Sequence, residues 1–158
     1  MWIDSHCHLD RLINCSLDSA LEAAWNHQVS HILTVSVTLD DFPHVLEITN
    51  QYPHKISCSV GLHPSENAIK EPSVDDIIRL SKNLAVVAIG ETGLDYHYDD
   101  VDFDIQRARL RTHINAAMIV SKPLIIHLRE AEEDLFAILK EEQADKISGV
   151  FHCFTGDW

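Results

Sequence analysis

Leu84-Ala-Val-Val-Ala-Ile89 is the most apolar run in the chain, and Gly90-Glu91-Thr92-Gly93-Leu94-Asp95 follows it directly. Continuous apolarity of this length is typical of a strand in a parallel sheet that is covered on both faces. The run therefore predicts a buried parallel strand, and the carboxylate of Glu91 lies where that strand is expected to end.

Runs of the same kind occur on both sides of this one, and helix-like segments separate them. The further strands are expected at residues 1–4, 31–37, 56–60, 123–126 and 147–152. Between the first two, apolar residues recur at helical spacing, namely Leu17, Leu21, Ala24 and Trp25. Asp40 or Asp41 is expected to cap the second helix, and Ser73 the third. The sequence thus predicts six strands that alternate with five helices.

Strict alternation of strands and helices implies a parallel sheet with right-handed crossovers, either a barrel or an open doubly wound sheet. In an open sheet the ligand-binding residues gather at one switch point, whereas in a barrel all strand ends face one centre. Here polar residues end five of the expected strands, which favours the barrel. A TIM-type barrel normally takes about 250 residues. We therefore expect an incomplete α/β barrel, a single domain over residues 1–158 that holds the first six strands.

Side chains that can bind metal stand at the expected strand ends. His6 and His8 are two residues apart in an extended segment, so both project to the same face and can chelate one ion. Such a pair by itself is equally typical of solvated histidines near a chain end. Three more candidates end other strands: Glu91, His127 and His152. Imidazoles and carboxylates suit zinc, manganese or similar divalent ions, and the sequence therefore predicts a metal site.

The composition limits the kinds of partner. Twelve basic and 25 acidic residues give a net charge of −13, which argues against binding an anionic polymer through a broad basic surface. A polyanionic substrate would need bound cations. Apolar runs fall short of the roughly 20 residues of a membrane helix, and no signal-peptide pattern is present, so we expect a cytoplasmic protein without membrane contact. No obligate protein partner is evident. The four cysteines are interpreted as free thiols.

The motifs at these strand ends resemble those of the TatD family of metal-dependent deoxyribonucleases, which belongs to the amidohydrolase-like superfamily. They are Ser5-His6-Cys7-His8-Leu9-Asp10, Gly61-Leu62-His63-Pro64, Gly90-Glu91-Thr92-Gly93-Leu94-Asp95, Ile126-His127-Leu128-Arg129 and Phe151-His152-Cys153-Phe154-Thr155-Gly156. The resemblance implies that His6 and His8 bind one metal, that His127 and His152 bind a second, and that Glu91 bridges both. The family also uses an aspartate from the last barrel strand. The chain stops at Trp158 before such a strand, so we expect a carboxyl-terminally truncated form, and Asp157 is a poor substitute.

The resemblance further implies DNA as the substrate, with single strands trimmed from an end. Two divalent ions, whether zinc, manganese or magnesium, would activate a water molecule for attack on the phosphodiester. Arg129 could clamp a phosphate oxygen or be a solvated arginine at a helix start, and His63 could donate to the same phosphate or cap its loop. Asp95 is either a turn residue or the hydrogen-bond partner of a ligand histidine.

Two other functions stay open. One is hydrolysis of a carbon–nitrogen or ester bond by another member of the superfamily. The other is an inactive product that binds metal or nothing, with uncovered sheet edges that favour association. The remaining histidines, His113 among them, are expected at the surface, and Trp2 and Trp25 in the core.

Overall fold

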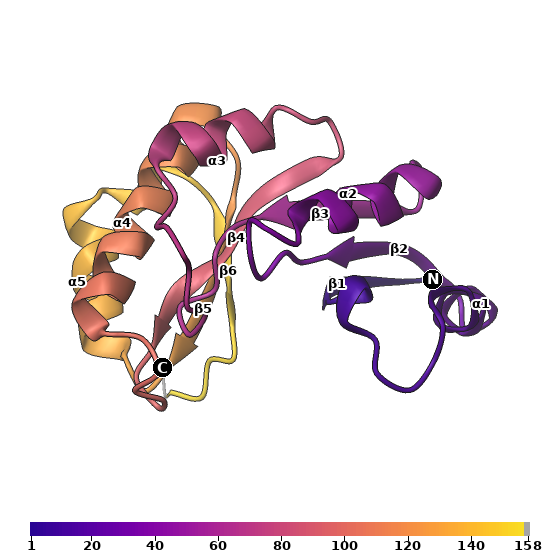
Figure 1. The fold of residues 1–158 in the computed structure, drawn as a ribbon, viewed down its shortest axis with the longest axis horizontal. Helices are drawn as coiled ribbons and strands as arrows, with labels where there is room; N and C mark the ends of the chain where they lie inside the picture. The colour runs from indigo at the N-terminus through magenta and orange to yellow at the C-terminus, as the bar shows by residue number, and fades with distance from the viewer. Residues whose placement is uncertain (157–158) are drawn as a thin grey trace.

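The computed structural model describes residues 1–156 and has one six-stranded sheet (Figure 1). The strands are β1 (Trp2–Cys7), β2 (Val29–Thr34), β3 (Ile56–Val60), β4 (Val86–Asp95), β5 (Leu124–Arg129) and β6 (Gly149–His152). Every neighbouring pair is parallel, and the order in the sheet is the order in the chain. The carboxyl ends of all six strands therefore lie at the same side of the sheet.

A helix follows each of the first five strands. These helices are α1 (Leu17–Asn26), α2 (Phe42–Gln51), α3 (Val74–Ser81), α4 (Phe103–Val120) and α5 (Glu132–Glu141), with short 3-10 helices at η1 (Leu9–Arg11) and η2 (Ala144–Lys146). Ser73 caps α3 as predicted, while Asp41 stands at the N-cap of α2 without a side-chain bond. The predicted six strands and five helices are confirmed. Within the described residues, none of the helices combines the length and apolarity needed to cross a membrane.

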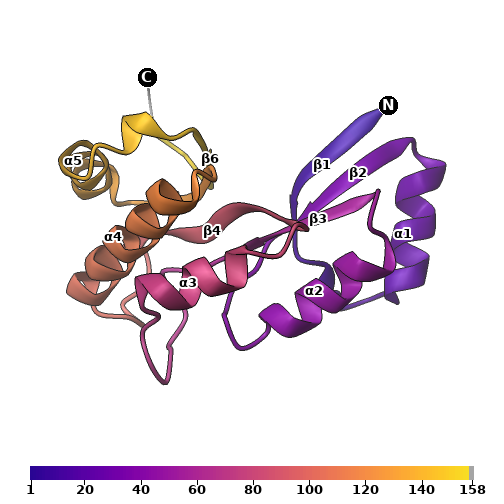
Figure 2. The same ribbon diagram turned by 90° about the horizontal axis from the view of Figure 1, so that it is seen from above.

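The strand order separates the two candidate architectures. A doubly wound sheet reverses its order at a switch point, and this sheet does not. Figures 1 and 2 show the sheet curling strongly along its length, with the helices on its outer side. The prediction of an incomplete TIM-type barrel is confirmed, with β1 and β6 as the edges of the sheet in the described part of the chain.

Alternation along β5 shows how the curl positions the site. Leu124, Ile126 and Leu128 face the helices and belong to the main apolar core. Ile125 faces the other way and packs with Val35 and Ala88 on the concave side. His127, two residues after Ile125, points to that same side because side chains alternate along a strand.

Two expectations about single residues were wrong. Trp25 packs against the core as predicted, but the side chain of Trp2 is 70% exposed because β1 is an edge strand. His113 is fully buried on α4 rather than at the surface. The polarity of His113 suggested exposure, but residues far away in the sequence pack around it and bury it.

Candidate metal centre

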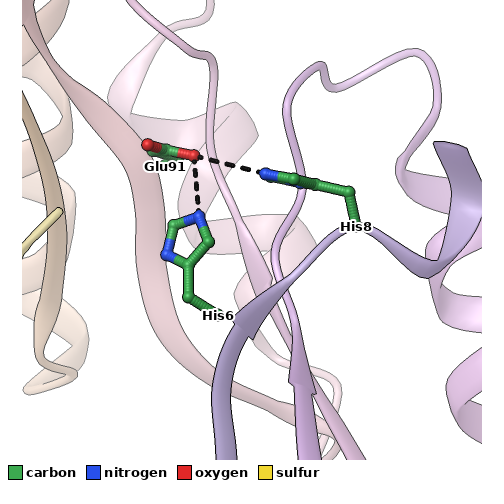
Figure 3. Close-up of side chains that lie close together, drawn as sticks. All are labelled: His6, His8 and Glu91. Atoms are coloured by element: carbon green, nitrogen blue, oxygen red, sulfur yellow. Dashed lines mark ion pairs between the residues drawn. The ribbon is translucent and has the colours of Figure 1, made fainter. Parts of the chain in front are cut away.

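The structure brings His6, His8, Glu91, His127 and His152 together from four strands. Figure 3 shows the imidazoles of His6 and His8 reaching from β1 toward the carboxylate of Glu91 on β4. Their Nε2 atoms lie 3.2 Å and 3.9 Å from Oε2 of Glu91. His6 in β1 and His8 directly after it thus point to the same side, as the alternation of side chains predicts.

The second oxygen of Glu91 faces a different group of histidines. Oε1 lies 3.0 Å from Nδ1 of His127 and 3.8 Å from Nε2 of His152. His63 approaches the same oxygen, with its Nε2 at 3.8 Å. One carboxylate therefore divides its two oxygens between two groups of imidazoles, which is the arrangement that a bridging ligand needs.

The curl of the sheet brings its two edge strands to this centre. The ring of His152, at the end of β6, stacks on the ring of His6, at the end of β1, with 3.8 Å between centroids and 9° between planes. The side chain of His152 is nevertheless 41% exposed, whereas that of Glu91 is 2% exposed. His152 consequently forms the open side of the cluster.

Gly93 allows β4 and β5 to approach closely beside His127. Its φ of +147° is unfavourable for other residues, and a Cβ at this position would lie 2.0 Å from the carbonyl oxygen of His127. The second glycine of the Gly-Glu-Thr-Gly motif is therefore required by the contact between the strands that carry Glu91 and His127.

Hydrogen bonds fix which nitrogen of each histidine faces the centre. Nδ1–H of His8 donates to the carbonyl oxygen of Val35 at 2.8 Å, which leaves its Nε2 as a ligand atom. Nε2–H of His127 donates to Oδ2 of buried Asp95 at 3.1 Å, which leaves its Nδ1 toward Glu91. Asp95 therefore has both of its expected roles: Oδ2 holds His127, a candidate ligand, and Oδ1 accepts the N–H of His97 at 3.0 Å, as in a turn.

The electrostatics keep Glu91 ionised. Burial opposes its ionisation, but the nearby imidazoles of His127, His6 and His63 outweigh this effect and hold the pKa of Glu91 well below its ordinary value. Burial lowers the pKa of His63 to about 4 and also lowers the pKa of His152. A buried carboxylate that stays ionised among several imidazole nitrogens is a suitable site for a cation.

The residues present fit a divalent ion. Nε2 of His6 is buried, and although it is 3.2 Å from Glu91 it forms no hydrogen bond to any residue within 1–156. Two groups bring their ligand atoms within 4.8 Å of one another: His6, His8 and Glu91, and His63, Glu91 and His127. Nitrogen and carboxylate donors in such groups match zinc or manganese.

His63 lies inside the cluster, but its hydrogen bonds favour a different role from that of the ligands. The backbone N–H of Ser65 donates to Nδ1 of His63 at 3.3 Å, so the neutral ring carries its proton on Nε2. That N–H points into the centre, where Nδ1 of His127 accepts it at 3.1 Å. A neutral donor in this place suits an anionic oxygen better than a metal ion.

Arg129 does not belong to the cluster. Arg129 follows His127 on the same face of β5, and its guanidinium lies 5.0 Å over the ring of Tyr98. Asp157 lies outside the described residues. Sequence reasoning missed Arg109 and His113 on α4, which hold the loop of His63; the available signal was their spacing of four residues, which places both on one side of a helix.

Comparison with known proteins places these features in a family. A profile of TatD-related DNases matches residues 3–158. A protein of Buchnera aphidicola named an uncharacterized metal-dependent hydrolase is 40% identical over 168 residues, an alignment that covers 99% of this chain and 63% of that protein. The uncharacterized metal-dependent hydrolase YcfH of Escherichia coli K12 is 37% identical over 98% of this chain and 59% of its own length.

Solved structures agree with the sequence comparison. A hydrolase of the TatD family from Entamoeba histolytica superposes with a TM-score of 0.85 at 30% identity, over 98% of this chain and 58% of that one. A phosphotriesterase homology protein from Escherichia coli shares the fold alone, with a TM-score of 0.68 at 12% identity. The chain thus spans less than two thirds of the length of the relatives it matches.

Proposed function

The chain belongs to the family of TatD-related DNases, and we propose that it is a metal-dependent hydrolase that cleaves phosphodiester bonds of DNA. The observation that carries this proposal is the division of the Glu91 carboxylate, with Oε2 toward His6 and His8 and Oε1 toward His127. A carboxylate that faces two groups of imidazoles can hold two cations next to each other.

We assign the ligands from this geometry. His6 and His8 would hold one ion, His127 and His152 the second, and Glu91 both. When bound, two divalent ions supply an activated water molecule and neutralise charge on the phosphate. Asp95 keeps Nδ1 of His127 directed at the centre through the 3.1 Å hydrogen bond to its Nε2–H. The net charge of −13 does not exclude an anionic substrate, because the attraction is local to the cations.

The chain's own donors would orient the substrate. Nε2–H of His63 points into the centre and can donate to a phosphate oxygen, and its lowered pKa, about 4, keeps the ring neutral at pH 7. Arg129 is proposed to bind a phosphate from the same face of β5, where its fixed positive charge complements the backbone of a nucleic acid. The substrate that the family suggests is single-stranded DNA, trimmed from an end, and the cytoplasm is the proposed setting.

The test compares the wild-type protein with Glu91→Gln after loading with zinc, manganese or magnesium. We expect the wild type to shorten an end-labelled single-stranded DNA and Glu91→Gln to lose this activity, because the variant lacks the charge shared by both groups of ligands. Glu133→Gln, an exposed change of the same type on α5, is the control and should keep full activity. Metal content and circular dichroism are measured for all three proteins.

A panel of substrates separates the alternatives. Hydrolysis of an amide or carboxylic ester without cleavage of DNA would identify a different hydrolase of the superfamily. Metal binding without turnover of any substrate would match an inactive product. Full DNA cleavage by Glu91→Gln in metal-replete buffer would contradict the proposed ligand assignment.

A further inference from the structure

The loop that carries His63 leaves β3 in direct contact with the peptide that carries Glu91. A Cβ on Gly61 would lie 2.6 Å from the carbonyl carbon of Gly90 and 2.8 Å from the carbonyl oxygen of Glu91, so only glycine fits there. Two residues later, the N–H of His63 donates to the carbonyl oxygen of Val37 at 2.9 Å. The path of this loop, residues 61–66, therefore decides where the imidazole of His63 stands.

Arg109 of α4 holds this loop by its backbone. Its Nη1 donates to the carbonyl oxygens of His63 at 2.6 Å and of Pro64 and Glu66 at 3.0 Å each. Its Nε and Nη2 form a two-pronged pair with the carboxylate of Glu71 at 2.9 Å and 2.5 Å. The side chain of Arg109 is 1% exposed. A buried guanidinium is costly unless its donors are satisfied, and three of the acceptors here are carbonyl oxygens of one loop.

His113 holds the beginning of the same loop from the next turn of α4. Its Nδ1–H donates to the carbonyl oxygen of Arg109 at 2.8 Å, and its Nε2 accepts the N–H of Leu62 at 3.0 Å. Residues four apart lie on the same side of a helix, so Arg109 and His113 face the loop together. Both acceptor and donor roles of His113 are thus fixed by backbone groups.

We propose that Arg109 and His113 are positioning residues, which hold the loop at residues 61–66 so that Nε2 of His63 stands beside Glu91 and His127. This inference rests on the proposed function for its catalytic consequence, and on geometry alone for the placement of His63. The other arginines of α4 differ: Arg107 and Arg111 direct their hydrogen bonds to Tyr96 and to acidic side chains, and not to the loop of His63. The buried arginine is therefore the one directed at the site.

Arg109→Lys tests the proposal against Arg111→Lys as a matched control. Lysine keeps the charge but cannot reproduce the planar fork that serves three carbonyls and a carboxylate. We expect kcat/KM for a single-stranded DNA to fall by roughly 10- to 100-fold in Arg109→Lys, the usual effect of losing a residue that orients an active-site group. Arg111→Lys should stay within about twofold of the wild type.

A double-mutant cycle distinguishes positioning from general stability. If Arg109 acts through His63, then Arg109→Lys should have little further effect in a protein that already carries His63→Ala. An equal loss in both backgrounds would show a merely structural role and overturn the proposal. His113→Leu should resemble Arg109→Lys, because it leaves the N–H of Leu62 without an acceptor.

The ring signals of His63 in NMR spectra provide a readout that needs no activity. They are assigned by their loss in His63→Ala, and we expect them to shift in Arg109→Lys but not in Arg111→Lys. A folded Arg109→Lys with unshifted signals would contradict the inference. Should Arg109→Lys fail to fold, Glu71→Gln makes the same test more gently, because that side chain is 43% exposed. If the wild type does not cleave DNA, the proposed function fails while the NMR comparison still decides the placement of His63.

Discussion

The buried imidazole of His113 should make the free energy of unfolding depend on pH. Burial lowers its pKa from 6.5 to about 4, with smaller effects from Arg109 and Glu71. Between these values the unfolded chain binds a proton that the folded protein excludes. The contribution of His113 to the free energy of unfolding therefore rises with pH through this window. It is lost as the pH falls from 6.5 to 4. A shift of this size corresponds to about 3 kcal/mol, since one pKa unit is about 1.4 kcal/mol.

His113→Gln should lose less stability over the same interval, because glutamine does not titrate. Urea unfolding of both proteins at pH 7 and pH 4, with a chelator present so that metal binding does not vary, measures the difference. Carboxylates and His63 titrate in both proteins, so their contribution cancels in the comparison. If both proteins lose the same unfolding free energy between pH 7 and pH 4, then His113 takes up its proton in the folded state as readily as in the unfolded chain.

The placement of single residues was predictable where strand periodicity determines it. The spacing of His6 and His8 was sufficient to put both on one face, and Glu91, His127 and His152 meet because their strands end at one side of the sheet. Their role as metal ligands stays a prediction. The burial of Arg109 and His113 was not predictable, because it depends on carbonyl and N–H groups of a loop more than forty residues away in sequence.

At the level of elements, the sequence predicted which segments form strands more accurately than it predicted where the strands end. β4 was predicted to end near Glu91, yet it pairs with β5 as far as Asp95. Gly90 and Gly93 lie inside this longer strand, where their lack of side chains allows β4 to lie close against β5. Close approach of two strands is a property of the pair, so neither strand shows it alone.

Gly93→Ala should separate β4 from β5 at the candidate metal centre. Its methyl group would lie 2.0 Å from the carbonyl oxygen of His127, and φ is +147°. We expect a loss of about 1–3 kcal/mol of stability, as for other strained or overpacked sites, together with weaker metal binding. Gly156→Ala is the control, because the nearest atoms there belong to the side chain of Phe154, which can move.

Thermal unfolding and calorimetric titration with zinc measure the two effects of Gly93→Ala. Gly156→Ala should behave like the wild type in both. If Gly93→Ala binds zinc normally and unfolds at the wild-type temperature, the contact between β4 and β5 does not determine the site.

For the whole molecule, the architecture was predicted from the positions at which polar residues end the strands. That placement favoured a barrel over a doubly wound sheet, and the sequential strand order agrees with it. The extent of the curl was not predictable, because it is the sum of small twists between neighbouring strands. The stacking of His6 on His152 shows its result: in the described part of the chain, the first and last strands of the sheet meet at the candidate metal centre without pairing.

The same open sheet leaves apolar surface beside β6. A groove of about 480 Å³ there includes Leu124, Ile126, Leu139 and Phe151, and the side chain of Phe151 is 46% exposed. On the other edge, Trp2 of β1 is 70% exposed. Exposed edge strands with apolar neighbours favour pairing between copies. We therefore expect a protein of residues 1–158 to associate as its concentration rises.

Light scattering after size-exclusion chromatography measures this association. The net charge of −13 opposes it through repulsion between copies, so added salt should strengthen it. Phe151→Gln should weaken association by reducing the apolar surface of the groove. Ile69→Gln is the control, since Ile69 is fully exposed in a loop away from both edges and its replacement should change nothing. A protein that stays monomeric at high concentration and high salt would show that the open edges do not drive association.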